Sequence, residues 1–127
     1  MQEALCLERV LENCIFCKIA RKEIPAKLLY EDEFVLGFHD VNPVAPTHVL
    51  VIPKKHIHSL NEISPEDGTL LGKIFFAIQK LAIDLGFAEE GYRVINNVGK
   101  HGGQTVFHIH FHIIAGKSFG WPPFANR

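Results

Sequence analysis

Apolar and polar residues alternate most strictly near the end of the chain. Three histidines two residues apart are separated and flanked by apolar residues there: His108, His110 and His112, with Phe107, Ile109, Phe111 and Ile113. A period of two is typical of a β-strand with one buried face and not of a helix. We therefore expect a strand over residues 107–114 that presents its imidazoles on one face, about 6.5 Å apart, and buries its apolar side chains on the other.

Four earlier segments have the length and the composition of β-strands. They cover residues 28–31, 34–39, 48–52 and 91–97. The first two are separated only by Asp32 and Glu33, which predicts a hairpin. The third is closed by Pro53, so the residues that follow should leave the sheet.

One segment has the periodicity of a long α-helix. Apolar residues recur at three- and four-residue spacing over residues 70–85. Ser64 is suited to the N-cap and Pro65 to the first turn, and Gly86 is a natural C-terminal stop. We expect this helix to cover the core.

Two weaker helical patterns precede the strands, one over residues 3–12 and one over residues 14–20. Together the elements predict an α+β protein, an antiparallel β-meander of about five strands with one long and one short helix. A chain of 127 residues is expected to form a single domain. Within it, we expect residues 1–13 to be an N-terminal extension and residues 115–127, with their glycines and prolines, to be a C-terminal tail.

The composition is that of an ordinary folded domain, with 47% hydrophobic and 21% charged residues. The formal net charge is -1, which disfavours general binding to nucleic acid, so a phosphate ligand has to be held by local donors. There is no apolar run long enough for a transmembrane helix, and no membrane partner is expected. The N-terminal residues carry Glu3, Glu8 and Glu12 and lack the apolar core of a signal peptide, which favours a cytoplasmic protein.

A glycine-rich turn, Gly-Gly-Gln-Thr at residues 102–105, directly precedes the histidine segment. Its glycines let backbone N–H groups approach an anion closely, and Thr105 adds a hydroxyl donor. A phosphate bound there would lie over His110. One neutral imidazole can attack phosphorus, and a second can give a proton to a leaving amine. His110 is the expected nucleophile because it has a histidine on either side.

These residues carry a resemblance to a known family. The segment His-Ile-His-Phe-His-Ile-Ile resembles the signature of the histidine triad (HIT) superfamily of nucleotide hydrolases and transferases. The similarity runs over nearly the whole chain and includes Ala-Pro-Thr-His at residues 45–48 and Trp-Pro-Pro at residues 121–123. Together these motifs are similar to the histidine triad nucleotide-binding branch, the purine nucleoside phosphoramidases.

The resemblance implies a HIT-like fold and an adenosine 5′-monophosphoramidase that cleaves a P–N bond and releases AMP. His110 matches the nucleophile of the family, which forms a covalent nucleotidyl-histidine. His48 matches the histidine beside the nucleophile, and His112 the residue that contacts the phosphate and the bridging atom. His108, the first member of the triad, completes the catalytic set, and no cofactor is required for catalysis.

The resemblance also implies a purine nucleotide site and a homodimer. Asp40 matches the carboxylate that accepts hydrogen bonds from the ribose hydroxyls. The family is a homodimer whose two sheets join, and its C-terminal tail around Trp121 reaches towards the site of the partner. The full set of matching nucleotide-binding positions is Ile15, Phe16, Ile19, Phe38, Asp40, Val41, Asn97, Gly103, Gln104, Thr105, His110, His112 and Trp121.

Cys14 and Cys17 form a Cys-x-x-Cys pair, which in a chain with no export signal suggests metal or redox use. In some bacterial relatives such a pair binds zinc with two histidines, and the matching residues here are His56 and His108. This Cys₂His₂ set suits a tetrahedral structural zinc. Two cysteines near the start of a helix can equally be buried apolar thiols, so the sequence leaves both interpretations standing.

Three other functions are compatible with the same residues. Hydrolysis of dinucleoside polyphosphates is the nearest alternative, although the Trp-Pro-Pro ending favours the phosphoramidase branch. A non-catalytic purine nucleotide sensor would use the same pocket. A metalloenzyme or metal carrier would use His108, His110 and His112 directly as ligands.

Overall fold

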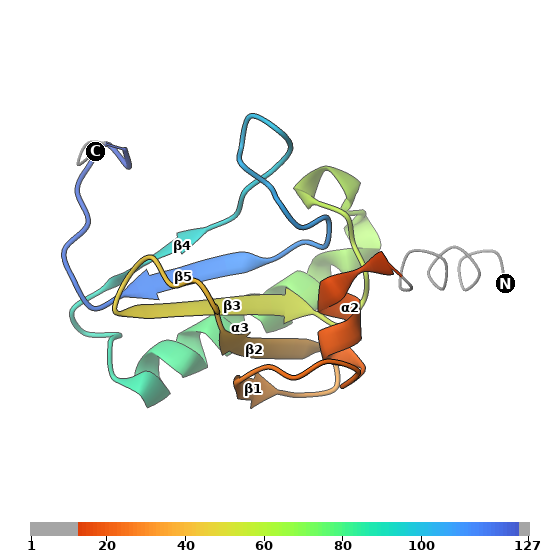
Figure 1. Cartoon of the computed structure of the whole chain (residues 1–127), viewed down its shortest axis with the longest axis horizontal. Coiled ribbons are helices and arrows are strands. Elements are labelled where there is room, and N and C mark those ends of the chain that lie inside the picture. The colour runs from red at the N-terminus through yellow and green to blue at the C-terminus, as the bar shows by residue number, and fades with distance from the viewer. Residues whose placement is uncertain (1–12, 125–127) are drawn as a thin grey trace, which may run out of the picture.

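The computed structural model describes residues 13–124, and five strands in this part of the chain form one antiparallel sheet (Figure 1). The strands are β1 (Leu28–Glu31), β2 (Val35–His39), β3 (Thr47–Pro53), β4 (Tyr92–Ile95) and β5 (Phe111–Ala115). A long helix, α3 (Gly68–Leu85), and a short one, α2 (Ile15–Ala20), complete the fold. The predicted α+β architecture is confirmed. The helix expected over residues 3–12 lies outside the described residues.

The last strand lies inside the sheet, whose order is β1-β2-β3-β5-β4. Four of the five residues of β5 are buried, whereas β4 alternates between exposed and half-buried side chains. Placing the more apolar strand in the centre removes more apolar surface from water. The order is possible because α3 carries the chain from β3 to the edge position of β4, from which β5 returns beside it (Figure 1).

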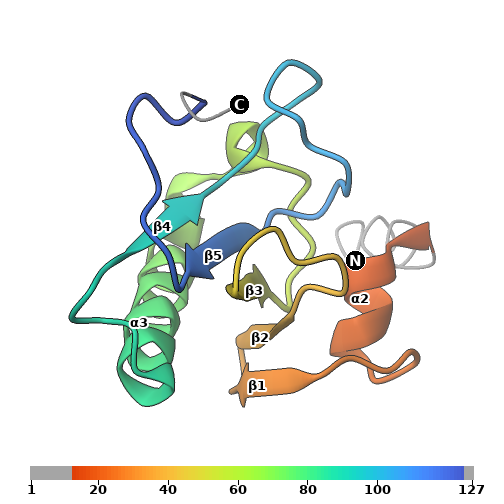
Figure 2. The same cartoon turned by 60° about the vertical axis from the view of Figure 1, so that its left-hand side comes forward.

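The two helices cover opposite faces of the sheet (Figure 2). Alternation along the strands therefore produces two separate cores. The core on the α3 side includes Val35, Val49, Val51, Ile74, Leu81 and Ile113. The core on the α2 side includes Phe16, Cys17, Ile19, Leu36, Phe38 and Ile52.

α3 is placed as the sequence predicts. It follows a short 3-10 turn (Pro65–Asp67), in which the backbone N–H of Ser64 donates to Asp67 Oδ2 at 3.0 Å. It ends at Gly86, whose φ of 87° is a left-handed conformation that glycine adopts without strain. Among the described residues, no helix is long and apolar enough to cross a membrane.

The strand expected over residues 107–114 is shorter than predicted. β5 begins at Phe111, and Phe107 is 53% exposed and stacks on His58 instead of joining the core. The physical reason is that the segment before Phe111 has no strand of β4 to pair with, because β4 pairs with β5 only as far as Ile95, which lies opposite His112. Before that point the main chain is held by a loop, through a bond from the Ile109 N–H to the Ile57 carbonyl at 2.6 Å.

Candidate functional site

His110 is buried on the α2 side of the sheet, where its ring meets the edge of the Phe16 ring. Its Nδ1 lies 2.8 Å from the carbonyl oxygen of His108. A carbonyl oxygen only accepts, so Nδ1 carries the proton and Nε2 keeps its lone pair. The neighbouring backbone therefore holds His110 in the tautomer that a nucleophile requires.

His112 is held in the complementary tautomer. The backbone N–H of Val44 donates to Nδ1 of His48 at 3.1 Å, so the neutral His48 ring carries its proton on Nε2. This Nε2 lies 2.9 Å from Nδ1 of His112 and 3.4 Å from Oδ2 of Asp40. Nδ1 of His112 therefore accepts, and its Nε2 carries a proton. The ring centroids of His110 and His112 lie 5.1 Å apart, so the ring with the free Nε2 lone pair and the ring with the Nε2 proton are neighbours.

Burial keeps these rings neutral. Desolvation lowers the pKa of His110 and of His48 below the ordinary value for histidine. The pKa of His112 is lowered to about 4 by desolvation, with further contributions from the nearby His110 and His48. At neutral pH the hydrogen-bond chain just described is therefore the populated form.

The glycine-rich turn is braced by the two side chains that the resemblance placed at the phosphate. Gln104 is 7% exposed, its Oε1 accepts from the Gly99 N–H, and its Nε2 donates to the His58 carbonyl at 2.8 Å. Asn97 Nδ2 donates to the Gly102 carbonyl at 2.6 Å. The side chains of Gln104 and Asn97 thus shape the turn. The N–H groups of Gly103 and Gln104 also donate within it, to the carbonyls of Lys100 and Gly99, which leaves the exposed Thr105 as the side-chain donor of this segment.

Gly102 has no room for a side chain, because a Cβ there would lie 2.2 Å from the Val98 carbonyl oxygen. Gly103 adopts a φ of 80°, which L side chains rarely adopt. Both glycines of the turn are therefore required by its backbone. This supports the sequence interpretation of the segment as a tight turn. Thr105 is exposed on it and lines a separate cleft with Ile15 and His56, and anion binding at the turn stays a prediction.

A cleft of about 660 Å³ opens at His48, and neither His110 nor His112 is among the residues that line it. Asp40, Val41 and His48 line it together with Ala26 and Pro46. Of the five apolar residues matched to the purine, Val41 lines this cleft and is 88% exposed, and Ile15 is 49% exposed. The other three, Phe16, Ile19 and Phe38, are buried in the core on the α2 side, where they support the site from beneath.

Trp121 is 81% exposed and lines a second cleft, of about 590 Å³, with Arg93 and Ile114. Arg93 Nη2 donates to the carbonyl of Gly120 at 2.6 Å and fixes the tail to β4. Within this chain Trp121 therefore belongs to the edge of the sheet and not to the cleft beside Asp40.

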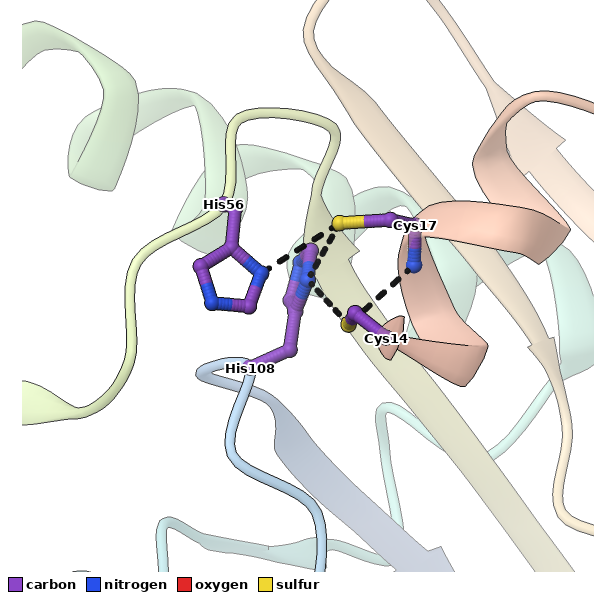
Figure 3. A group of neighbouring side chains, drawn as sticks. All are labelled: Cys14, Cys17, His56 and His108. Atoms are coloured by element: carbon purple, nitrogen blue, oxygen red, sulfur yellow. Dashed lines mark hydrogen bonds between the residues drawn. The ribbon is translucent and has the colours of Figure 1, made fainter. Parts of the chain in front are cut away.

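His108 differs from the other two histidines of the triad, because its side chain lies in a group with Cys14, Cys17 and His56 (Figure 3). Its Nε2 lies 2.8 Å from the Pro53 carbonyl, so Nε2 carries the proton and Nδ1 keeps the lone pair. Nδ1 lies 3.3 Å from Sγ of Cys14 and 3.4 Å from Sγ of Cys17. Both ring nitrogens are thus engaged away from the cleft. The side chain of His108 therefore belongs to the cysteine cluster, and its expected catalytic role stays a prediction.

The cysteine cluster is completed by His56, whose Nδ1 lies 3.3 Å from Sγ of Cys17 (Figure 3). The ligand atoms of the four residues all lie within 4.8 Å of one another. Hydrogen bonds from Cys17 and His108 lower the pKa of the Cys14 thiol, which favours a thiolate. Two sulfurs and two imidazole nitrogens with free lone pairs are a donor set that fits tetrahedral zinc.

A metal held by the triad itself finds no support in this geometry. His108 faces the sulfurs, and Nδ1 of His110 bonds a carbonyl. Asp40, His48 and His112 also bring their ligand atoms within 4.8 Å of one another. The Val44 N–H, however, leaves the proton of His48 on Nε2, the atom that would have to bind the ion.

Sequence reasoning missed the backbone groups of Val44 and Pro53 and the side chain of Asn96, which donates to the carbonyl of His110. Backbone donors and acceptors have no residue-type signature, so no pattern could have identified the first two. Asn96 carried a weak signal, since it is a polar residue at the end of an apolar strand.

The comparisons identify the class of protein. A family model of the HIT domain matches residues 21–119, and the chain belongs to the HIT family. A HIT-like protein from Synechocystis sp. is 52% identical over 112 residues, which are 88% of this chain and 97% of the relative. The purine nucleoside phosphoramidase of Escherichia coli K12 is 45% identical over 116 residues, which are 91% and 97% of the two chains.

Solved structures agree with this assignment. A HIT family hydrolase from Legionella pneumophila superposes with a TM-score of 0.86 at 50% identity, covering 87% of this chain and 99% of that one. A histidine triad nucleotide-binding protein from Candida albicans superposes with a TM-score of 0.75 at 38% identity, covering 87% and 83%. The fold is therefore shared with these proteins.

Proposed function

We propose that this chain is a purine nucleoside phosphoramidase that hydrolyses the P–N bond of adenosine 5′-monophosphoramidates through a nucleotidyl-histidine on His110. The observation that carries the proposal is the pair of opposite tautomers, a lone pair on Nε2 of His110 beside a proton on Nε2 of His112. The similarity to the phosphoramidase of Escherichia coli supports the choice of reaction within the family.

In the proposed first step, Nε2 of His110 attacks phosphorus, and a new N–P bond forms as the P–N bond of the substrate breaks. The leaving nitrogen takes one proton from solvent and departs as an amine. Nε2–H of His112 donates a hydrogen bond to the phosphoryl group or its bridging nitrogen and stabilises the developing charge. The positive charge that arises on the His110 ring is stabilised by its Nδ1–H bond to the carbonyl of His108.

In the proposed second step, a water molecule attacks the phosphorus of the nucleotidyl-histidine. The N–P bond breaks, AMP leaves, and the proton taken up earlier returns to solvent. His110 regains the lone pair on Nε2. The chemistry is complete with the side chains of this chain and water.

The proposed nucleotide lies in the cleft beside Asp40. The carboxylate of Asp40 accepts from the ribose hydroxyls, and the purine packs against Val41 and the neighbouring apolar wall. The phosphate lies between the turn at residues 102–105 and the His110–His112 pair, with the hydroxyl of the exposed Thr105 as a donor from the turn.

We propose two further features that accompany this function. A structural zinc would bind Cys14, Cys17, His56 and His108, where it would tie α2 to the loop that leads into β5. A homodimer would form through the free edge of β4, on which Tyr92 and Val94 are exposed. Neither is required for the chemistry at His110.

Rapid quench of the protein with a fluorogenic AMP phosphoramidate, followed by peptide mass spectrometry, tests the proposal. We expect a mass increment of one AMP on the peptide that contains His110. AMP binding without adduct or turnover would indicate a nucleotide sensor. Turnover of a dinucleoside polyphosphate with none of the phosphoramidate would assign the chain to the other hydrolase branch.

A further inference from the structure

His110 lies at a break in the sheet. The last register pair between β4 and β5 is Ile95 opposite His112, and β5 itself begins at Phe111. The backbone of His110 is therefore beyond the regular hydrogen-bond ladder. A buried carbonyl at such a position needs another donor.

Asn96, the residue that follows β4, supplies this donor. Its Nδ2 lies 2.9 Å from the carbonyl oxygen of His110. Because a carbonyl only accepts, the orientation of the amide is fixed, with its NH₂ group towards His110 and Oδ1 turned away. The side chain thus replaces the ladder bond that the end of β4 removes.

The oxygen of the Asn96 amide makes no such hydrogen bond among the described residues. Oδ1 of Asn96 is buried and has no hydrogen-bond partner among residues 13–124. A buried amide oxygen without a partner costs stability, so packing alone does not favour asparagine here. The bond from Nδ2 to the carbonyl of His110 is the favourable interaction that offsets this cost.

The bond holds the main chain of His110, whereas a separate bond orients its ring. The His110 ring is oriented by the His108 carbonyl at 2.8 Å, and its main chain is held by Asn96. We propose that Asn96 is a positioning residue that fixes the backbone of His110 and thereby the direction of its Nε2 lone pair. This inference rests on the hydrolase function proposed above.

The neighbouring asparagine offers a contrast. Asn97 donates to the carbonyl of Gly102 and so braces the glycine-rich turn. Two adjacent asparagines with similar chemistry therefore hold two different parts of the site, one the nucleophile and the other the phosphate turn. Loss of the Asn96 amide should lower kcat, and loss of the Asn97 amide should raise KM.

Steady-state kinetics of Asn96→Ala in the full chain, with a fluorogenic AMP phosphoramidate, test the proposal. We expect kcat to fall by about tenfold to a hundredfold, as for a small misplacement of a reacting group, while the Kd for AMP stays within about twofold. Asn96→Gln keeps an NH₂ donor on a longer arm and should recover part of kcat. Asn61→Ala, an exposed asparagine in the short turn Leu60–Glu62, is the matched control and should behave like the wild type.

If Asn96→Ala does not fold, Asn96→Ser replaces it in the test. The serine hydroxyl is too short to reach the carbonyl oxygen of His110, so the bond is lost in this variant as well. Wild-type kcat in either variant would overturn the proposal. A loss of AMP affinity as large as the loss of kcat would overturn it as well, because it would indicate a general loosening of the site.

Nitrogen-15 NMR of the histidine rings separates this inference from the proposed function. If the wild type does not turn over the phosphoramidate, the hydrolase proposal fails. The NMR spectra then still test whether Asn96 positions the His110 ring. In the wild type we expect His110 to hold its proton on Nδ1, and in Asn96→Ala we expect a mixture of tautomers. An unchanged His110 signal would then overturn the positioning role, with the His108 signal as the reference for an intact fold.

Discussion

The two faces of the sheet are built from the same strands but are covered differently. On the face under α3, a helix of 18 residues, a cluster of buried apolar side chains forms the core. The face under α2, a helix of 6 residues, contains two buried cysteines and borders the buried His48, His108 and His110. The α3 face contributes to stability through buried apolar side chains. The other buries polar groups, whose burial is made tolerable by hydrogen bonds to the surrounding backbone and to one another.

This contrast explains why the site lies on the α2 side. A short helix covers little of the sheet, so a cleft is left beside Asp40 and His48. The long helix leaves no comparable access to Ile109, Phe111 and Ile113, which point into the other core from the same segment. Changes on the α2 face should therefore alter the chemistry, and changes on the α3 face the stability.

The largest effect is expected on the α2 face. His110→Ala removes the proposed nucleophile and should lower kcat on the order of 10⁴-fold or more, because no other group takes its place in the covalent step. AMP binding, measured by calorimetry, should be retained. His58→Ala, which removes an exposed imidazole that stacks on Phe107, is the control. Substantial turnover by the His110 variant would show that the reaction does not pass through this residue.

The α3 face should respond in the opposite way. Ile74 is fully buried in α3, and Ile74→Ala should lower the free energy of unfolding by about 2–5 kcal/mol through lost burial and the cavity left behind. Urea denaturation measures this change. The kcat of the folded fraction should stay close to that of the wild type. A fall in kcat as large as that of a site variant would mean that the two faces are not independent.

Removal of the proposed zinc should have a smaller effect, on the stability of the α2 face. We expect a chelator to lower the Tm of the wild type by about 5 °C or more, because binding energy at the site contributes to folding. Cys17→Ser should show a similarly lowered Tm and no further change with the chelator. Metal analysis should find one zinc per chain in the wild type only. If the wild type and Cys17→Ser have the same Tm with and without the chelator, no zinc is bound, and Cys14 and Cys17 are buried thiols.

The smallest effect is expected from pH. The folded pKa of His112, about 4, lies below the ordinary 6.5, so the unfolded chain binds the proton more tightly. This group should therefore reduce stability as the pH falls from about 6.5 towards 4, with no further loss below that range. Because His110 and His112 stay neutral, kcat/KM should hold its plateau below pH 6.5. An acid limb centred at 6.5 or above in the pH profile of kcat/KM would contradict this prediction.

Much of the fold follows from local pattern. The spacing of apolar residues over 70–85, with Ser64 before them and Gly86 after them, was sufficient to place α3. The glycines at 102 and 103 marked a turn because the backbone there admits no side chain or adopts positive φ. The alternation around His110 correctly separated the histidines from Ile109 and Ile113. It overestimated the strand, because pairing depends on where a distant strand ends.

The sequence by itself determined the elements, the alternating faces and the set of residues that resemble the HIT family. Only the tertiary structure decided which ring nitrogen of each histidine carries the proton. His108, His110 and His112 are equivalent in spacing, and they differ because the backbone groups of Pro53, His108 and Val44 set the tautomers of the rings around them. Main-chain hydrogen bonds have the same chemistry at almost every residue, so their partners are set by the fold and leave no trace in the sequence.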